Sequence, residues 1–80
     1  MELLDVAELR ELNYQEITRR LRKLGFRLYR QGKGSHELWV RDADGRVVPV
    51  PHDRGKAIRK GTVRAIIREV GSDVTEFMEL

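Results

Sequence analysis

The spacing of apolar residues changes abruptly at Gly25, and this change sets the order of secondary structure in the chain. Before Gly25, a single apolar stripe recurs at helical intervals and predicts a helix that begins after Asn13. Asn13 can cap this helix, and Glu16, three residues later, completes the spacing of a capping box. Gly25 is the expected left-handed stop. The stripe consists of Tyr14, Ile17, Leu21 and Leu24.

Beyond Gly25 apolar and polar residues alternate, and a period of two predicts β-strands. A glycine-rich turn separates the first strand from the second, and an Asp-Gly hairpin turn separates the second from the third. Short connections of this kind join antiparallel neighbours, so we expect a three-stranded meander. The expected strands cover residues 26–31, 36–41 and 46–50.

The alternation in the second strand places Leu38 and Val40 on one face and Trp39 on the other. Leu38 and Val40 are expected to face the core, and the same alternation would turn His36 inward with them. The first residue of a strand beside a glycine-rich turn need not follow the alternation, so the direction of His36 stays open. Trp39 and Tyr29 would then offer ring faces on which bases can stack.

A second helix is predicted over residues 61–70, with Gly71 at its end. Ser72 can cap a short last turn. Pro49 cannot donate to a β-ladder, so the third strand should lie at an edge of the sheet. Each helix has one apolar stripe, and packing both stripes on one face of the meander gives two layers. The fold class is therefore α+β: a helix, a three-stranded antiparallel sheet and a helix.

Charge is distributed unevenly along the chain, although the net charge is only +3. Residues 13–68 carry a net charge of +10, whereas residues 1–12 carry −3 and residues 69–80 carry −4. Such a basic middle favours a polyanionic partner, the alternative being a soluble surface on an arginine-rich chain. There is no cysteine, no apolar run near the roughly 18 residues of a membrane span and no basic start of a signal peptide, so a cytoplasmic protein is expected.

His36 and His52 are the only side chains that titrate near neutral pH without strong perturbation. His36 follows the stretch Gly32–Ser35, whose glycines allow a ligand to approach the backbone and whose Lys33 attracts phosphate. The alternative is a half-buried strand histidine satisfied by a backbone hydrogen bond. His52 lies in a polar loop and is expected to be solvated. Two histidines with scattered acids form no metal-binding motif, so no metal or cofactor is expected.

Five short motifs, in this order and at these spacings, resemble the HicA toxins of bacterial and archaeal toxin–antitoxin pairs. They are the LRKLGF end of the first helix, Gly34-Ser35-His36, Asp44-Gly45, Pro51-His52 and Lys60-Gly61-Thr62. The resemblance covers about residues 13–80, and residues 1–12 form an N-terminal extension outside it. It implies a fold like the double-stranded RNA-binding domain, cleavage of mRNA without a metal, and control by a HicB-type antitoxin. His36 matches the catalytic histidine of the family.

RNA carries its own nucleophile, the 2′-hydroxyl, so an enzyme need only align it, move protons and stabilise charge on the phosphate. We expect His36 to act as a general acid or base. Contacts with RNA are expected from five residues, the three lysines being the phosphate contacts: Lys33, Gly34, Ser35, Lys56 and Lys60. An RNA-binding module without turnover is the alternative, and a purely structural partner of an acidic protein is a third possibility. Salt-dependent RNA binding separates the third from the other two.

Overall fold

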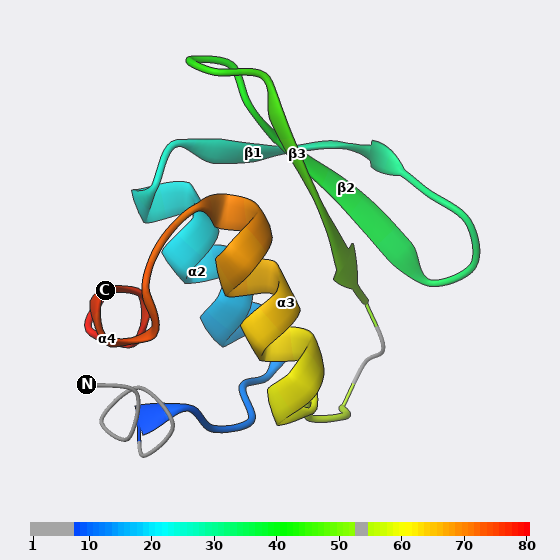
Figure 1. Ribbon diagram of the computed structural model, residues 1–80. Coiled ribbons are helices and arrows are strands. Elements are labelled where there is room, and N and C mark those ends of the chain that lie inside the picture. The colour runs from blue at the N-terminus through cyan, green and yellow to red at the C-terminus, as the bar shows by residue number, and fades with distance from the viewer. Residues whose placement is uncertain (1–7, 53–54) are drawn as a thin grey trace.

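The sequence folds as predicted, into a helix, a three-stranded antiparallel sheet and further helices (Figure 1). The structure is a computed structural model that describes residues 8–52 and 55–80, so most of the expected N-terminal extension, residues 1–7, lies outside the described residues. The strand order is β1-β2-β3, which confirms the edge position that Pro49 predicts for β3. The elements are α2 (Tyr14–Lys23), β1 (Phe26–Gln31), β2 (His36–Arg41), β3 (Arg46–Pro51), α3 (Lys60–Val70) and α4 (Val74–Met78).

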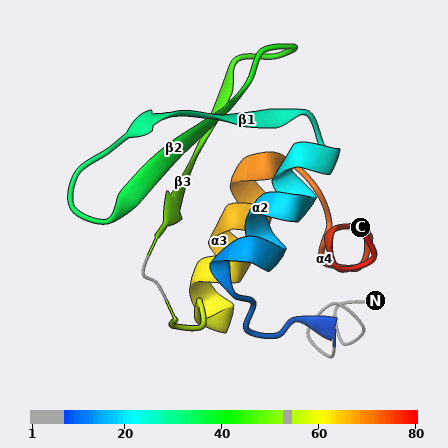
Figure 2. The same ribbon diagram turned by 180° about the vertical axis from the view of Figure 1, so that it is seen from behind.

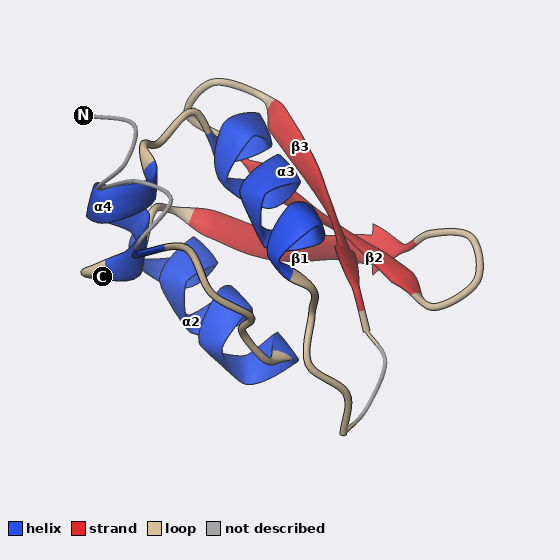
Figure 3. Cartoon of the chain, turned by 60° about the horizontal axis from the view of Figure 1, so that its bottom comes forward, coloured by secondary structure: helices blue, strands red, loops and turns tan. Residues whose placement is uncertain are grey.

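Both long helices lie on the same side of the sheet, and the two opposite views agree on this (Figures 1 and 2). The short α4 lies beside the helices, away from the strands. In the described part of the chain, the opposite face of the sheet carries no helix. The turn between β1 and β2 projects past the helices at one end of the molecule (Figure 3). The two-layer packing expected from the apolar stripes is therefore confirmed.

Local capping interactions explain where the helices begin and end. Asn13 Oδ1 accepts a hydrogen bond from the Glu16 N–H at 2.8 Å, and Glu16 Oε1 accepts one from the Asn13 N–H at 3.0 Å, which confirms the capping box. Gly71 ends α3 in the left-handed conformation with φ of 85°. The cap of α4 is Asp73 rather than the predicted Ser72, because the Asp73 side chain accepts the Glu76 N–H at 2.7 Å.

The face of β2 that packs against the helices is not the one that the sequence predicts. Trp39 is fully buried and Glu37 is 5% exposed, whereas Leu38 and Val40 are only partly buried. The expectation that Leu38 and Val40 face the core is therefore wrong. His36 does alternate with them, and it is exposed as a result.

A pair of backbone hydrogen bonds ties the segment before α2 to the segment before α3. The Leu12 N–H donates to the Ile58 carbonyl at 3.3 Å, and the Ile58 N–H donates to the Leu12 carbonyl at 2.7 Å. Leu12 is 1% exposed and belongs to the core. This bridge holds the chain around residues 55–59 beside the start of α2.

Part of the positive charge of residues 13–68 holds the fold together. Arg20 is 3% exposed, and its guanidinium donates to the Phe77 carbonyl at 3.1 Å and to the Met78 carbonyl at 3.2 Å, which attaches α4 to α2. Burial lowers the pKa of Arg20. Arg27 forms an ion pair with Asp42 at 2.8 Å across the β1–β2 hairpin. These arginines stabilise the protein itself, so the positive charge available to a polyanionic partner is smaller than the sequence total.

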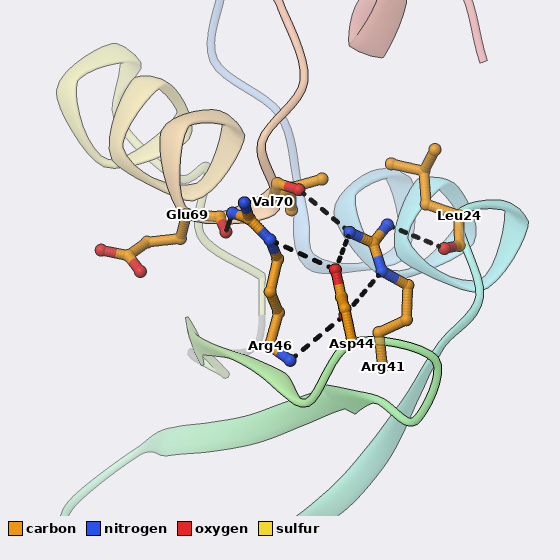
Figure 4. A network of polar contacts seen from close by, with 6 residues as sticks. All are labelled: Leu24, Arg41, Asp44, Arg46, Glu69 and Val70. Atoms are coloured by element: carbon orange, nitrogen blue, oxygen red, sulfur yellow. Dashed lines mark hydrogen bonds and ion pairs between the residues drawn. The ribbon is translucent and has the colours of Figure 1, made fainter.

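A second arginine network fastens the β2–β3 turn to the ends of both long helices (Figure 4). Arg41 pairs with Asp44 at 2.8 Å and donates to the Leu24 carbonyl, at the end of α2, at 3.2 Å. Arg46 pairs with the same carboxylate at 3.3 Å and donates to the Glu69 carbonyl of α3 at 2.8 Å. One carboxylate thus holds two arginines that each contact a helix.

We expect Asp44→Asn to reduce the acid sensitivity of the fold. The hydrogen bond from Arg41 lowers the pKa of Asp44 from 3.8 to about 2. Because the folded-state pKa lies below the unfolded one, the carboxylate stabilises the fold above about pH 4, and this stabilisation is lost as the pH falls toward 2. Thermal unfolding midpoints should therefore fall less between these pH values in the variant than in the wild type. Equal falls would show that the Asp44 network has no part in acid unfolding.

Candidate active site

The turn between β1 and β2 presents His36 at the first position of β2. Gly34 takes a positive φ of 61°, and the His36 N–H donates to the Lys33 carbonyl at 3.1 Å, which closes the turn. The His36 carbonyl accepts from the Gly32 N–H at 2.8 Å and from Gln31 Nε2 at 3.0 Å. The backbone of His36 is therefore held on both sides, while its imidazole is exposed.

His36 and Lys33 line one open groove of about 720 Å³. Arg30 also lines it, so two cationic side chains and one imidazole face the same space. A Cβ on Gly32 would lie 3.3 Å from the His36 carbonyl oxygen, tighter than an ordinary contact, so glycine suits the close turn here. An anionic ligand in this groove would meet the imidazole together with positive charge.

The expected stacking platform does not form as predicted. Trp39 is buried in the core under α2, where the Arg22 guanidinium lies 5.0 Å from its ring centroid, so its ring is closed to a base. Tyr29 is 56% exposed. It stands at a β-bulge between Leu28 and Arg30, where the β1–β2 register shifts.

The other predicted contacts are spread over separate parts of the surface. Gly34 and Ser35 are exposed in the turn, and the Ser35 carbonyl accepts the His52 N–H at 2.7 Å. Lys56 lines a different cleft, and Lys60 is exposed at the start of α3. Of the three predicted phosphate contacts, only Lys33 shares a groove with His36.

His52 lies in a structured cluster, and the expectation of a solvated loop histidine is wrong. Its Nδ1 lies 3.0 Å from Glu37 Oε2, and its ring stacks on Tyr14 with centroids 4.0 Å apart and planes 17° from parallel. Glu37 Oε1 accepts from the Tyr14 hydroxyl at 2.6 Å and from Trp39 Nε1 at 3.1 Å. The buried carboxylate therefore has three donors, which come from α2, β2 and the end of β3.

Burial of Tyr14, together with its hydrogen bond to Glu37, raises the pKa of the Tyr14 hydroxyl to about 12. The phenol therefore stays protonated at neutral pH and keeps donating to Glu37. The cleft beside this cluster holds about 580 Å³ and is lined by residues at the start of α2 and in the loop before α3. The lining residues are Asn13, Tyr14, Gln15, His52, Gly55, Lys56 and Ala57.

Within residues 8–52 and 55–80, no three His, Cys, Asp or Glu side chains gather in a way that could hold a metal ion. In the same described part of the chain, no helix has the length and apolar character needed to cross a membrane.

The described part of the chain is a small two-layer α+β domain with an exposed histidine at a glycine-rich strand entrance. A family model described as the HicA toxin of bacterial toxin–antitoxin systems matches residues 14–72, which is more than half of the chain. The chain therefore belongs to the HicA toxin family and is the toxin component of a toxin–antitoxin system, with a HicB antitoxin as its implied partner. Among curated proteins no match to the chain is found.

Proposed function

We propose that this toxin is a metal-independent endoribonuclease that cleaves mRNA, with His36 moving a proton in the reaction. The observation that carries the proposal is the exposed His36 imidazole in one groove with Lys33, at a turn whose backbone is held by hydrogen bonds. An imidazole is suited to proton transfer near neutral pH, and a nearby ammonium stabilises charge that develops on a phosphate.

The reaction needs no external nucleophile. The 2′-hydroxyl of RNA attacks the neighbouring phosphorus, the P–O5′ bond breaks, and a 2′,3′-cyclic phosphate and a 5′-hydroxyl result. His36 is exposed and lines an open groove, so an extended strand can reach it without displacing an element of the fold. Lys56 and Lys60 lie outside the His36 groove, and their proposed role is to hold the part of the RNA that extends beyond it.

The antitoxin is proposed to stop cleavage by covering the same groove. A partner that is acidic where it meets residues 13–68 would pair with the side chains that otherwise meet RNA phosphates. The groove of His36, Lys33 and Arg30 is the part of that surface on which exclusion of RNA would stop the reaction most directly.

We expect cleavage of a labelled RNA by the purified protein to survive excess EDTA, because the proposed chemistry relies on imidazole and on the 2′-hydroxyl. The rate in EDTA should equal the rate in magnesium once ionic strength is matched. Loss of cleavage in EDTA that a divalent ion restores would contradict the mechanism. RNA that is bound but never cut under either condition would instead favour the non-catalytic RNA-binding module.

A further inference from the structure

A second groove begins at His36 and runs between β3 and α3. It has a volume of about 220 Å³, and it shares His36 and Pro49 with the groove that contains Lys33. The two grooves therefore meet at the imidazole. We call the second one the β3–α3 groove, and its other lining residues are Pro51, Thr62, Ala65, Ile66 and Glu69.

The walls of the β3–α3 groove are mostly apolar. Two proline rings come from β3, and α3 contributes one stripe of side chains at positions i, i+3, i+4 and i+7. The volume is below the roughly 300–1,000 Å³ of sites that enclose a drug-sized ligand, so the groove suits one flat nucleobase. A polypeptide strand is a poorer occupant, because Pro49 and Pro51 have no N–H with which to pair it.

His36 and Glu69 lie at opposite ends of the β3–α3 groove. Arg46, the first residue of β3, donates to the carbonyl of Glu69 near the end of α3, whereas Pro51, the last residue of β3, pairs with His36. The strand and the helix therefore run in opposite directions, with Thr62 at the His36 end. Thr62 and Glu69 are about 10 Å apart along the helix axis. One nucleoside bridges this span when its phosphate lies at His36 and its base points along the groove.

Glu69 brings the only carboxylate among the described residues that line this groove. Arg46 contacts the backbone carbonyl of Glu69, and the carboxylate points away from Arg46 (Figure 4). Within residues 8–52 and 55–80, no cationic side chain forms an ion pair with this carboxylate. Two acceptor oxygens are therefore available at the end of an apolar groove.

Two neighbouring acceptors match the hydrogen-bonding edge of guanine. The Watson–Crick edge of guanine offers two adjacent donors, N1–H and the N2 amino group, and one carboxylate can accept from both. Adenine and cytosine place a ring acceptor beside their amino group, and uracil places a carbonyl on each side of its single donor. We propose that the β3–α3 groove binds a guanine next to the scissile phosphate and that Glu69 selects this base; the inference rests on the proposed function.

The base preference of cleavage tests the assignment. A pool of RNA oligonucleotides with a random central segment is partly digested by the wild-type protein, and the ends of the products are sequenced. The competition within the pool gives the relative kcat/KM for each base beside the cleaved bond. We expect guanine on one fixed side of this bond, favoured over each other base by about 10- to 100-fold, the discrimination that one bidentate contact provides.

Glu69→Gln should abolish the preference for guanine. An amide offers one acceptor and one donor, which match the amino group and the ring nitrogen of adenine or cytosine instead. Glu79→Gln is the matched control, because it removes the same charge from an exposed position outside the groove and should keep the guanine preference. The preference is a ratio within one preparation, so any loss of folded protein cancels.

Ala65→Leu tests the groove independently of the carboxylate. Ala65 is exposed and leucine is also a good helix former, so the larger side chain should occupy the groove and weaken the guanine preference without disturbing α3. Cleavage by the wild type with no base enriched, enrichment of another base, or a guanine preference that Glu69→Gln retains would overturn the inference and leave the proposed function in place. A wild-type protein that cuts no RNA in the pool would refute the proposed function, and this inference with it.

Discussion

His36→Ala is expected to reduce RNA cleavage by about 10²- to 10⁴-fold, the usual contribution of a positioned acid or base. The imidazole is exposed at the first position of β2, and the hydrogen bonds that close the turn come from the His36 backbone. The substitution removes neither these bonds nor a core contact, so the free energy of unfolding should change by no more than about 0.5 kcal/mol. Cleavage rates and thermal unfolding of the same preparations check both parts.

Lys33→Ala provides a matched comparison in the same groove. Loss of the Lys33 ammonium should weaken RNA binding and make the binding less dependent on salt. The cleavage rate at saturating RNA should fall less than it does in His36→Ala. A His36→Ala protein that unfolds well below the wild-type temperature would show that the histidine is structural. A folded variant that still cleaves at the wild-type rate would remove His36 from the chemistry.

Trp39→Ala is expected to destabilise the fold by about 3–5 kcal/mol, the range found when a large buried aromatic is truncated. The ring is fully buried between β2 and α2, and its Nε1 donates to Glu37. Truncation leaves a cavity and removes one of three donors from a buried carboxylate. Because the chain has a single tryptophan, chemical unfolding should be followed by circular dichroism rather than by fluorescence.

Tyr29→Ala is the control, since its 56% exposed ring should contribute no more than about 0.5 kcal/mol. Similar losses of stability in the two variants would contradict the burial of Trp39. They would instead support the expectation from the sequence that Leu38 and Val40 face the core and that Trp39 lies on the exposed face.

The order of elements could be predicted because each signal is local. Asn13 and Glu16 form their capping box within one turn of helix, and Gly25 and Gly71 adopt positive φ at the helix ends. Pro49 predicts an edge strand through its missing N–H alone. None of these inferences depends on a partner far away in the chain.

The inner face of β2 could not be predicted, because its burial depends on distant partners. Glu37 and Arg41 flank Trp39 and make that face look polar. Glu37 is buried because Tyr14 and His52, from α2 and from the end of β3, donate to it together with Trp39. Arg41 covers the Phe26 ring at 4.7 Å from its centroid and keeps its charge at the β2–β3 turn.

Only the part of the candidate site that consists of neighbours in the sequence could be predicted. The glycines and the lysine beside His36 are neighbours in sequence and mark the turn directly. The His52–Glu37 pair joins the residue that follows β3 to a residue of β2, and only the β2–β3 register places them together. The one local sign of a buried carboxylate is Glu37 two residues before Trp39, which places both on the same face of the strand.

The measurement that tests the central claim most directly replaces one 2′-hydroxyl by hydrogen. An RNA carrying a single 2′-deoxy nucleotide immediately 5′ to a mapped cleavage site is incubated with the wild-type protein. The same RNA with the deoxy nucleotide moved one position away is the control. We predict that the first RNA stays intact at this site, while the control is cut to a 2′,3′-cyclic phosphate and a 5′-hydroxyl. Equal cleavage of both RNAs would show that the attacking nucleophile is water and would contradict the mechanism.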